Sequence, residues 1–185
     1  LMVQDWGGPI GLAVAIRHPE RVAAVVIANT FAWPKTDTAT RLFSRIMGGP
    51  IGSYLVLWRN AFVEWILPGN VRRTKLPPRV MAAYRGPFPT PGSRWPTQVF
   101  PRELIASRAF LAEVERGLGA LADRPALIVW PTRDPAFRRA ERRRFERAFP
   151  THHTVLVRGA GHYVQEDAPR EIVAAVRAWR PVSPG

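Results

Sequence analysis

Cysteine is absent from the 185 residues, and its absence excludes several kinds of chemistry. There is no disulfide framework, no thiol nucleophile and no metal site built on thiolates. Histidine is also scarce, with four residues: His18, His152, His153 and His162. Their spacing with acidic residues is not that of zinc ligands, so we predict neither a metal nor a cofactor. Since no apolar run approaches the length of a membrane span, we expect no membrane partner and a cytoplasmic location.

Lysine is nearly absent, because 25 of the 27 basic residues are arginine and only Lys35 and Lys75 are lysine. The formal net charge of +13 would favour an anionic partner. However, the arginines are spread along the whole chain and accompany many alanines and prolines, which is typical of a biased base composition in the gene. Basic charge alone carries no sequence information, so we expect no nucleic-acid partner.

The chain begins with Leu1 rather than methionine, and its first residues already have the apolar character of a buried strand. A parallel sheet is not built from its last few strands alone. The sequence therefore leads us to expect an amino-terminal truncation.

Two regions of different character make up the chain. Apolar runs that alternate with helical patterns over residues 1–34 and 101–185 predict part of an α/β core, with a mostly parallel sheet flanked by helices. We predict strands over 1–4, 22–28, 126–130 and 153–157, and core helices over 8–18, 103–121, 136–149 and 169–179. Residues 35–100 show no buried strand. They carry helix-like pieces over 39–47, 52–66 and 77–84 and many aromatic residues, which predicts a helical cap domain over a pocket.

Residues 3–11 read VQDWGGPIG and predict a sharp turn from strand to helix. Pro9 suits the first helical turn, where a missing N–H costs nothing. A reactive side chain at such a corner is the nucleophile-elbow arrangement, and the neighbouring glycines relieve the strained backbone that it needs. The corner residue here is Asp5. Taken alone, Asp5 could equally be an ordinary N-cap of the following helix.

Two further polar residues lie at strand exits, namely Asp134 and His162. Functional residues of an open parallel sheet collect at the carboxyl ends of its strands. The order nucleophile, acid, histidine is the order found in α/β-hydrolases. We therefore predict a catalytic triad of Asp5, Asp134 and His162, although Asp134 before a proline could be a turn residue and His162 a loop histidine.

Four stretches together resemble one family. They are the elbow at 3–11, NAFVEWILP at 60–68, YRGPFPTP at 84–91 and GHYVQEDAP at 161–169. With them the chain resembles the haloalkane dehalogenases, which are enzymes of the α/β-hydrolase fold with a helical cap. No carboxylate follows the strand before the cap, so the likeness is to the branches with an Asp–His–Asp triad.

The resemblance implies a mechanism and a set of partners. Asp5 would displace halide from a small apolar halogenated substrate, and His162, oriented by Asp134, would activate water to hydrolyse the resulting ester. Trp6 would hold the leaving halide, because an indole N–H is only a donor. The resemblance further implies a substrate pocket lined by Phe62, Phe100, Pro101 and Tyr163.

Departures from the family pattern leave alternatives open. The earlier loop that supplies a second oxyanion donor and a halide-binding asparagine does not occur in this sequence. Trp65 or Trp95 could substitute as the second halide donor, although their positions do not demand it. We expect the chain as it stands to be inactive or feebly active, which makes a catalytically impaired hydrolase fragment one alternative. Another is an epoxide hydrolase of the same fold, which needs two cap tyrosines, and Tyr54 and Tyr84 are the only ones. A basic binding module without catalysis is the third.

Overall fold

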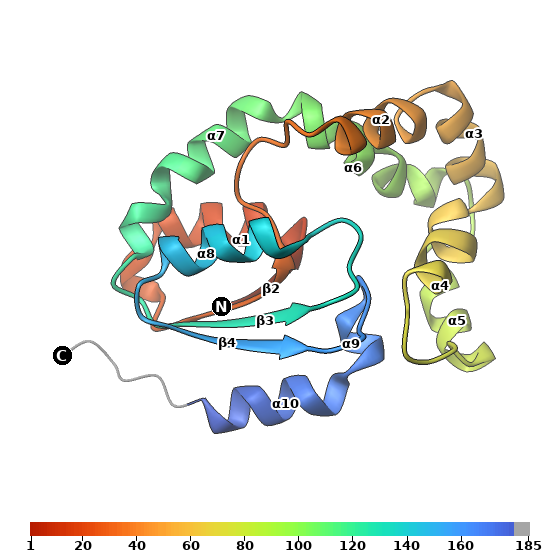
Figure 1. The fold of residues 1–185 in the computed structure, drawn as a ribbon. Helices are drawn as coiled ribbons and strands as arrows, with labels where there is room; N and C mark the ends of the chain where they lie inside the picture. Colours follow the sequence, from red (N-terminus) through yellow and green to blue (C-terminus); the bar gives the residue numbers. More distant parts are fainter. Residues whose placement is uncertain (180–185) are drawn as a thin grey trace.

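The computed structural model describes residues 1–179, whose centre is a sheet of four parallel strands in the spatial order β1-β2-β3-β4 (Figure 1). The strands are β1 (Met2–Asp5), β2 (Val25–Thr30), β3 (Ala126–Pro131) and β4 (His152–Val157). Strand β3 is buried along its whole length, as expected of a central strand in a parallel sheet. In register, Val25 pairs with Ala126, which pairs with His152.

Helices cover both faces of the sheet (Figure 1). On one face lie α1 (Gly7–Arg17), α7 (Arg108–Gly117) and α8 (Arg139–Ala148), and on the other α9 (Val164–Asp167) and α10 (Pro169–Ala178). Because side chains alternate along a strand, Ile128 packs with the first group whereas Leu127 and Val129 pack with the second. The predicted α/β-hydrolase architecture of a parallel sheet flanked by helices is confirmed.

The remaining helices form a group at the end of the sheet toward which β3 and β4 point (Figure 1). They are α2 (Thr38–Met47), α3 (Pro50–Arg59), the π-helical turn η2 (Phe62–Ile66), α4 (Leu67–Gly69), α5 (Pro78–Arg85), the 3₁₀ turn η3 (Gly92–Arg94) and α6 (Trp95–Ala106). Two further 3₁₀ turns, η1 (Pro19–Arg21) and η4 (Leu118–Leu121), lie beside the core. The predicted boundary between cap and core at residue 100 falls inside α6, and the division into two domains stays a prediction.

Several element boundaries differ from the prediction, and the helix predicted over 52–66 is divided into α3 and η2. The second strand begins at Val25 rather than Val22, since its pairing with β3 starts at Val25 and residues 22–24 are irregular. It continues to Thr30, and its terminal polar side chains find partners in neighbouring segments. The helix predicted over 103–121 is divided among α6, α7 and η4. The helix predicted from residue 136 starts only at Arg139, since the Asp134 carboxylate accepts the N–H groups of the next residues in a turn.

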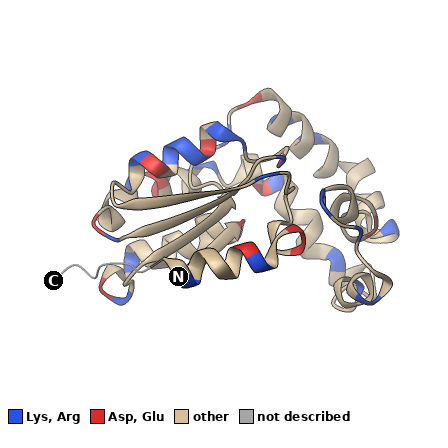
Figure 2. Cartoon of the chain, turned by 60° about the horizontal axis from the view of Figure 1, so that its bottom comes forward, with Lys and Arg blue, Asp and Glu red and all other residues tan. Residues whose placement is uncertain are grey.

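Charged residues are distributed over core and cap helices alike rather than gathered on one element (Figure 2). On the arginine-rich helix α8, Glu141 pairs with Lys35 at 2.6 Å and Glu146 pairs with Arg142 at 2.7 Å. The second pair neutralises one arginine of the helix, whereas the first holds a lysine from outside the helix on Glu141. Within residues 1–179 no helix is both long enough and apolar enough to cross a membrane.

Candidate active site

Asp5 lies at the corner between β1 and α1 and has a backbone φ of +47°. This left-handed conformation is unusual for a residue with a side chain and is held by its surroundings. The backbone carbonyl of Asp5 accepts a hydrogen bond from the Thr30 hydroxyl on β2. A Cβ atom at Gly8 would lie 1.8 Å from that same hydroxyl oxygen, so only glycine fits there, whereas a Cβ at Gly7 would meet nothing within 4 Å. The turn therefore depends on the second glycine of the pair.

The structure brings the three predicted triad residues together. Nδ1 of His162 lies 3.0 Å from Oδ2 of Asp134, and Nε2 lies 3.3 Å from Oδ1 of Asp5. The Asp134 side chain is completely buried and that of His162 is 16% exposed, whereas the Asp5 side chain is 40% exposed. One carboxylate is thus accessible to a ligand, and the other serves only the protein interior.

Asp134 is oriented by groups that the sequence did not reveal as site residues. Its Oδ2 accepts a hydrogen bond from Nδ2 of Asn29 at 2.6 Å, and its Oδ1 accepts the backbone N–H groups of Ala136 and Phe137 at 2.7 and 3.2 Å. Asn29 is fully buried near the end of β2. The only available signal was an amide side chain at the end of an otherwise apolar run, which does not identify its partner.

The backbone of His162 is fixed from two sides. Its carbonyl accepts the side-chain amides of Gln4 at 2.9 Å and Asn29 at 2.8 Å, both from the sheet. Its N–H donates to the backbone carbonyl of Asn70 at 3.0 Å, in the segment that follows α4. The position of the imidazole therefore depends on core and cap together.

The charge state of His162 follows from these contacts. Burial lowers its pKa, but the hydrogen bonds and negative charges of Asp134 and Asp5 outweigh burial and raise the pKa to about 10. His162 is accordingly an imidazolium at neutral pH. Burial and the nearby Asp5 charge also raise the pKa of Tyr163, which keeps its hydroxyl neutral.

Trp6 and two of the predicted pocket residues surround this centre. The half-buried Trp6 ring packs edge-on against Phe31 with centroids 5.1 Å apart, and against Phe100 at 5.3 Å. Tyr163 meets the His162 ring edge-on at 5.1 Å. The other two predicted pocket residues lie in helical elements of residues 35–106, with Phe62 half-buried in η2 and Pro101 buried within α6.

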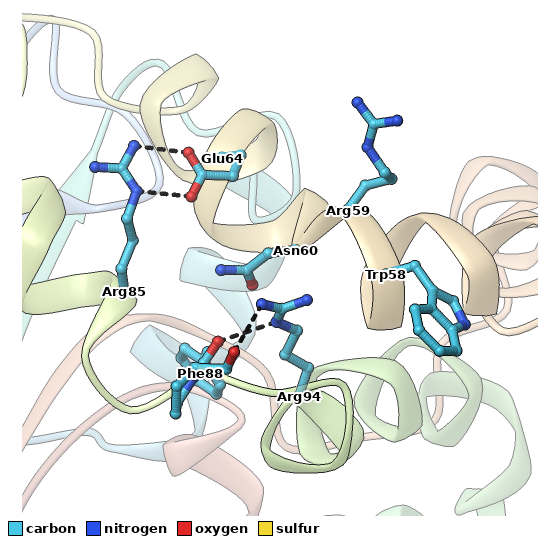
Figure 3. A pocket seen from close by; sticks show the side chains of 8 residues that line it. Trp58, Arg59, Asn60, Glu64, Arg85, Phe88 and Arg94 are labelled. Carbon is cyan, nitrogen blue, oxygen red and sulfur yellow. Dashed lines mark hydrogen bonds and ion pairs between the residues drawn. The ribbon is translucent and has the colours of Figure 1, made fainter.

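A separate cavity of about 340 Å³ lies within the cap (Figure 3). Three of its four charged side chains are engaged within the cap, because Arg85 donates twice to Glu64 at 2.7 Å, and Arg94 donates to the carbonyls of Leu57 at 2.7 Å and Phe88 at 3.0 Å. The hydrogen bonds of Arg85 lower the pKa of Glu64 against the opposing effect of burial, and the charges of Arg85 and Arg94 lower it further. The eight lining residues include none of the triad: Trp58, Arg59, Asn60, Glu64, Arg85, Phe88, Pro89 and Arg94. We interpret this cavity as a structural feature of the cap and not as the reaction site.

Residues 1–179 contain no group of three or more acidic or histidine side chains placed to hold a metal ion. The chemistry that the arrangement can perform is that of an accessible carboxylate beside an imidazole, which is in turn held by a buried carboxylate. Such a constellation forms and hydrolyses covalent esters.

Comparison with known proteins agrees with this geometry. The model of the alpha/beta hydrolase fold family matches residues 1–169, and the chain belongs to that family. Within it, the chain is 40% identical over 177 residues to haloalkane dehalogenase 2 of Mycobacterium tuberculosis, covering 95% of this chain. It is 33% identical to a cis-3-alkyl-4-alkyloxetan-2-one decarboxylase of Xanthomonas campestris, covering 97% of this chain and 62% of that protein.

Solved structures give the same family context. The crystal structure of a putative ancestral haloalkane dehalogenase superposes with a TM-score of 0.84 at 33% identity, covering 97% of this chain and 66% of that one. The predicted resemblance to haloalkane dehalogenases is thereby confirmed. The chain spans 62% of the length of the mycobacterial relative.

Proposed function

We propose that this protein hydrolyses carbon–halogen bonds of small apolar haloalkanes through an ester on Asp5, giving an alcohol and a halide ion. The observation that carries the proposal is the convergence of Asp5, His162 and Asp134, with the accessible carboxylate 3.3 Å from the imidazole. The relatives named above supply the substrate class.

In the first step a carboxylate oxygen of Asp5 attacks the carbon that bears the halogen. A carbon–oxygen bond forms, the carbon–halogen bond breaks, and the halide leaves with the electron pair. The Trp6 indole N–H stabilises the negative charge that develops on the halogen. The contacts of Trp6 with Phe31 and Phe100 limit the movement of the ring.

The second step follows from the effect of the first on His162. Esterification removes the negative charge of Asp5, which is one of the two charges that raise the pKa of His162. The imidazolium then releases its proton to solvent more readily, and the neutral imidazole takes a proton from water while the water oxygen attacks the ester carbonyl. Cleavage of the acyl–oxygen bond releases the alkoxide, which takes the proton from the imidazolium and leaves as the alcohol. The imidazole then takes the proton of the Asp5 carboxyl, which restores the carboxylate.

The epoxide hydrolase alternative receives less support. It needs two cap tyrosine hydroxyls directed at the reacting oxygen. The Tyr84 hydroxyl instead donates to Glu166 at 2.7 Å, and Tyr54 is 57% exposed on α3.

A β-lactone is the second substrate class to be tested, because the Xanthomonas relative is named for a reaction on an oxetan-2-one. Release of carbon dioxide when the protein is incubated with a β-lactone, together with no release of halide from a haloalkane, would favour that class.

A trapping experiment tests the proposal directly. The His162→Gln variant is incubated with 1-bromobutane and analysed by intact-protein mass spectrometry, with bromide measured in parallel. We expect about one bromide per chain, a mass gain of one butyl group and its location on Asp5. Asp5→Ala is the matched control and should gain no mass. Absence of both bromide and butyl from the wild-type chain and from His162→Gln would refute the proposal.

A further inference from the structure

Asp167 is a buried carboxylate at the end of α9 for which the proposed chemistry has no use. It accepts backbone N–H groups from two distant parts of the chain. Gly161 donates at 2.6 Å, Arg73 at 2.7 Å, and Arg72 to both carboxylate oxygens at 3.0 Å. A buried carboxylate normally needs such partners, and here all three are backbone groups of loops.

The two loops that Asp167 joins have different roles. Gly161 directly precedes His162 in the exit loop of β4, whereas Arg72 and Arg73 lie between the cap helices α4 and α5. The same cap segment receives the N–H of His162 on the carbonyl of Asn70. The histidine loop is thus connected to the cap by hydrogen bonds of two consecutive peptide N–H groups, those of Gly161 and His162.

The fit between these loops is tight. A Cβ atom at Gly161 would lie 2.2 Å from the Asn70 carbonyl oxygen, so no larger residue can occupy that position without separating the loops. Farther out, the Arg73 guanidinium pairs with Glu171 and donates to the Arg158 carbonyl at 2.8 Å. That outer pair is largely exposed, and exposed pairs contribute little.

We propose that Asp167 is a positioning residue that holds His162 in place by tying its loop to cap residues 70–73. The proposal rests on the proposed function, since it concerns the step that His162 performs. Asp5 is positioned independently, through Thr30 and Gly8. Loss of Asp167 should therefore impair hydrolysis of the ester and leave its formation intact.

The Asp167→Asn variant separates these two steps. Its amide NH₂ would face backbone donors, so at least one N–H loses its acceptor. We expect the initial bromide burst of about one equivalent per chain to remain, while steady-state turnover falls on the order of 100-fold, the cost of a displaced catalytic group. The butyl ester should accumulate. Glu171→Gln, which breaks only the exposed pair, is the matched control and should change neither quantity.

A second readout does not depend on activity. Amide hydrogen exchange measured by NMR should become at least roughly tenfold faster at Gly161, Arg72 and Arg73 in Asp167→Asn, because these N–H groups donate to the carboxylate that is replaced. Exchange should also become faster at His162, because separation of the two loops weakens its hydrogen bond to the Asn70 carbonyl. Ile128 on the central strand should keep its protection.

The outcomes distinguish this proposal from the proposed function. If the wild-type protein forms no ester, the proposed function fails, and amide hydrogen exchange alone then decides whether Asp167 positions the loop of His162. Unchanged exchange in the folded variant, or equal loss of burst and turnover, would overturn the positioning role. If Asp167→Asn does not fold, Gly161→Ala carries the test, because it separates the same loops with the carboxylate in place; full protection and turnover in Gly161→Ala would likewise overturn the proposal.

Discussion

Removal of the Asp5 charge should lower the pKa of His162, as esterification is proposed to do during the reaction. In the Asp5→Asn variant the imidazolium loses a partner 3.3 Å away. The Coulomb energy at that distance is about 1 kcal/mol at the dielectric constant of water and about 5 kcal/mol at an effective value of 20. Because the Asp5 side chain is 40% exposed, the lower part of this range applies, which corresponds to roughly 1–2 pKa units. We therefore expect the pKa of His162 to fall from about 10 to roughly 8–9.

The measurement is an NMR titration of the imidazole Cε1–H signals of wild-type protein and Asp5→Asn. Signals of the other three histidines, His18, His152 and His153, are recorded in the same spectra as internal references. A His162 midpoint that moves by less than roughly half a unit would refute the reasoning, since no interaction of the calculated size would then exist. The ester could not in that case activate the histidine in the way proposed.

Two further predictions concern stability and are measured by urea denaturation. Gly8→Ala should lower the free energy of unfolding by about 3 kcal/mol through steric overlap with Thr30, whereas Gly7→Ala, which meets nothing, should change it by no more than about 1 kcal/mol; equal losses would contradict the contact. Because the folded-state pKa of His162 is raised, its protonated form stabilises the fold fully below about pH 6.5, and this contribution is lost as pH rises toward about 10. Between about pH 6.5 and about pH 10, the free energy of unfolding of the wild-type protein should fall more steeply than that of Asp5→Asn. Parallel curves of free energy against pH would contradict the raised pKa of His162.

The sequence was informative where a local pattern carries the chemistry. A carboxylate between an apolar strand and a proline-initiated helix predicts an elbow at Asp5, and the structure places a positive φ there. Strand exits predict which polar residues share an edge of the sheet, and Asp134 and His162 lie together as expected. Such inferences succeed because parallel strands bring their carboxyl ends to one side regardless of the details of packing.

The sequence did not predict the boundaries of several helices and strands, nor the residues that orient the triad. The extension of β2 to Thr30 depends on partners in β1 and in the loop after β3, which lie 25 and 105 residues away in sequence. The break between α6 and α7 was likewise not visible in the helical pattern, and the close approach of α7 to α1 depends on the absence of a side chain at Gly117, where a Cβ would lie 2.7 Å from Ile16. The requirement for glycine at position 8 but not at position 7 is also a matter of tertiary contact.

By itself, therefore, the sequence determined the class of fold, the elbow, and the identity and order of the three residues that meet at the proposed site. These follow from local propensity and from the period of apolar residues, which act over a few neighbouring positions. Only the tertiary structure decided what orients those residues: Asn29 on Asp134, and Asp167 with Asn70 on the loop of His162. The Asn29–Asp134 and Asn70–His162 contacts join residues 105 and 92 positions apart, and hydrogen bonds of that range leave no periodic trace in a single sequence.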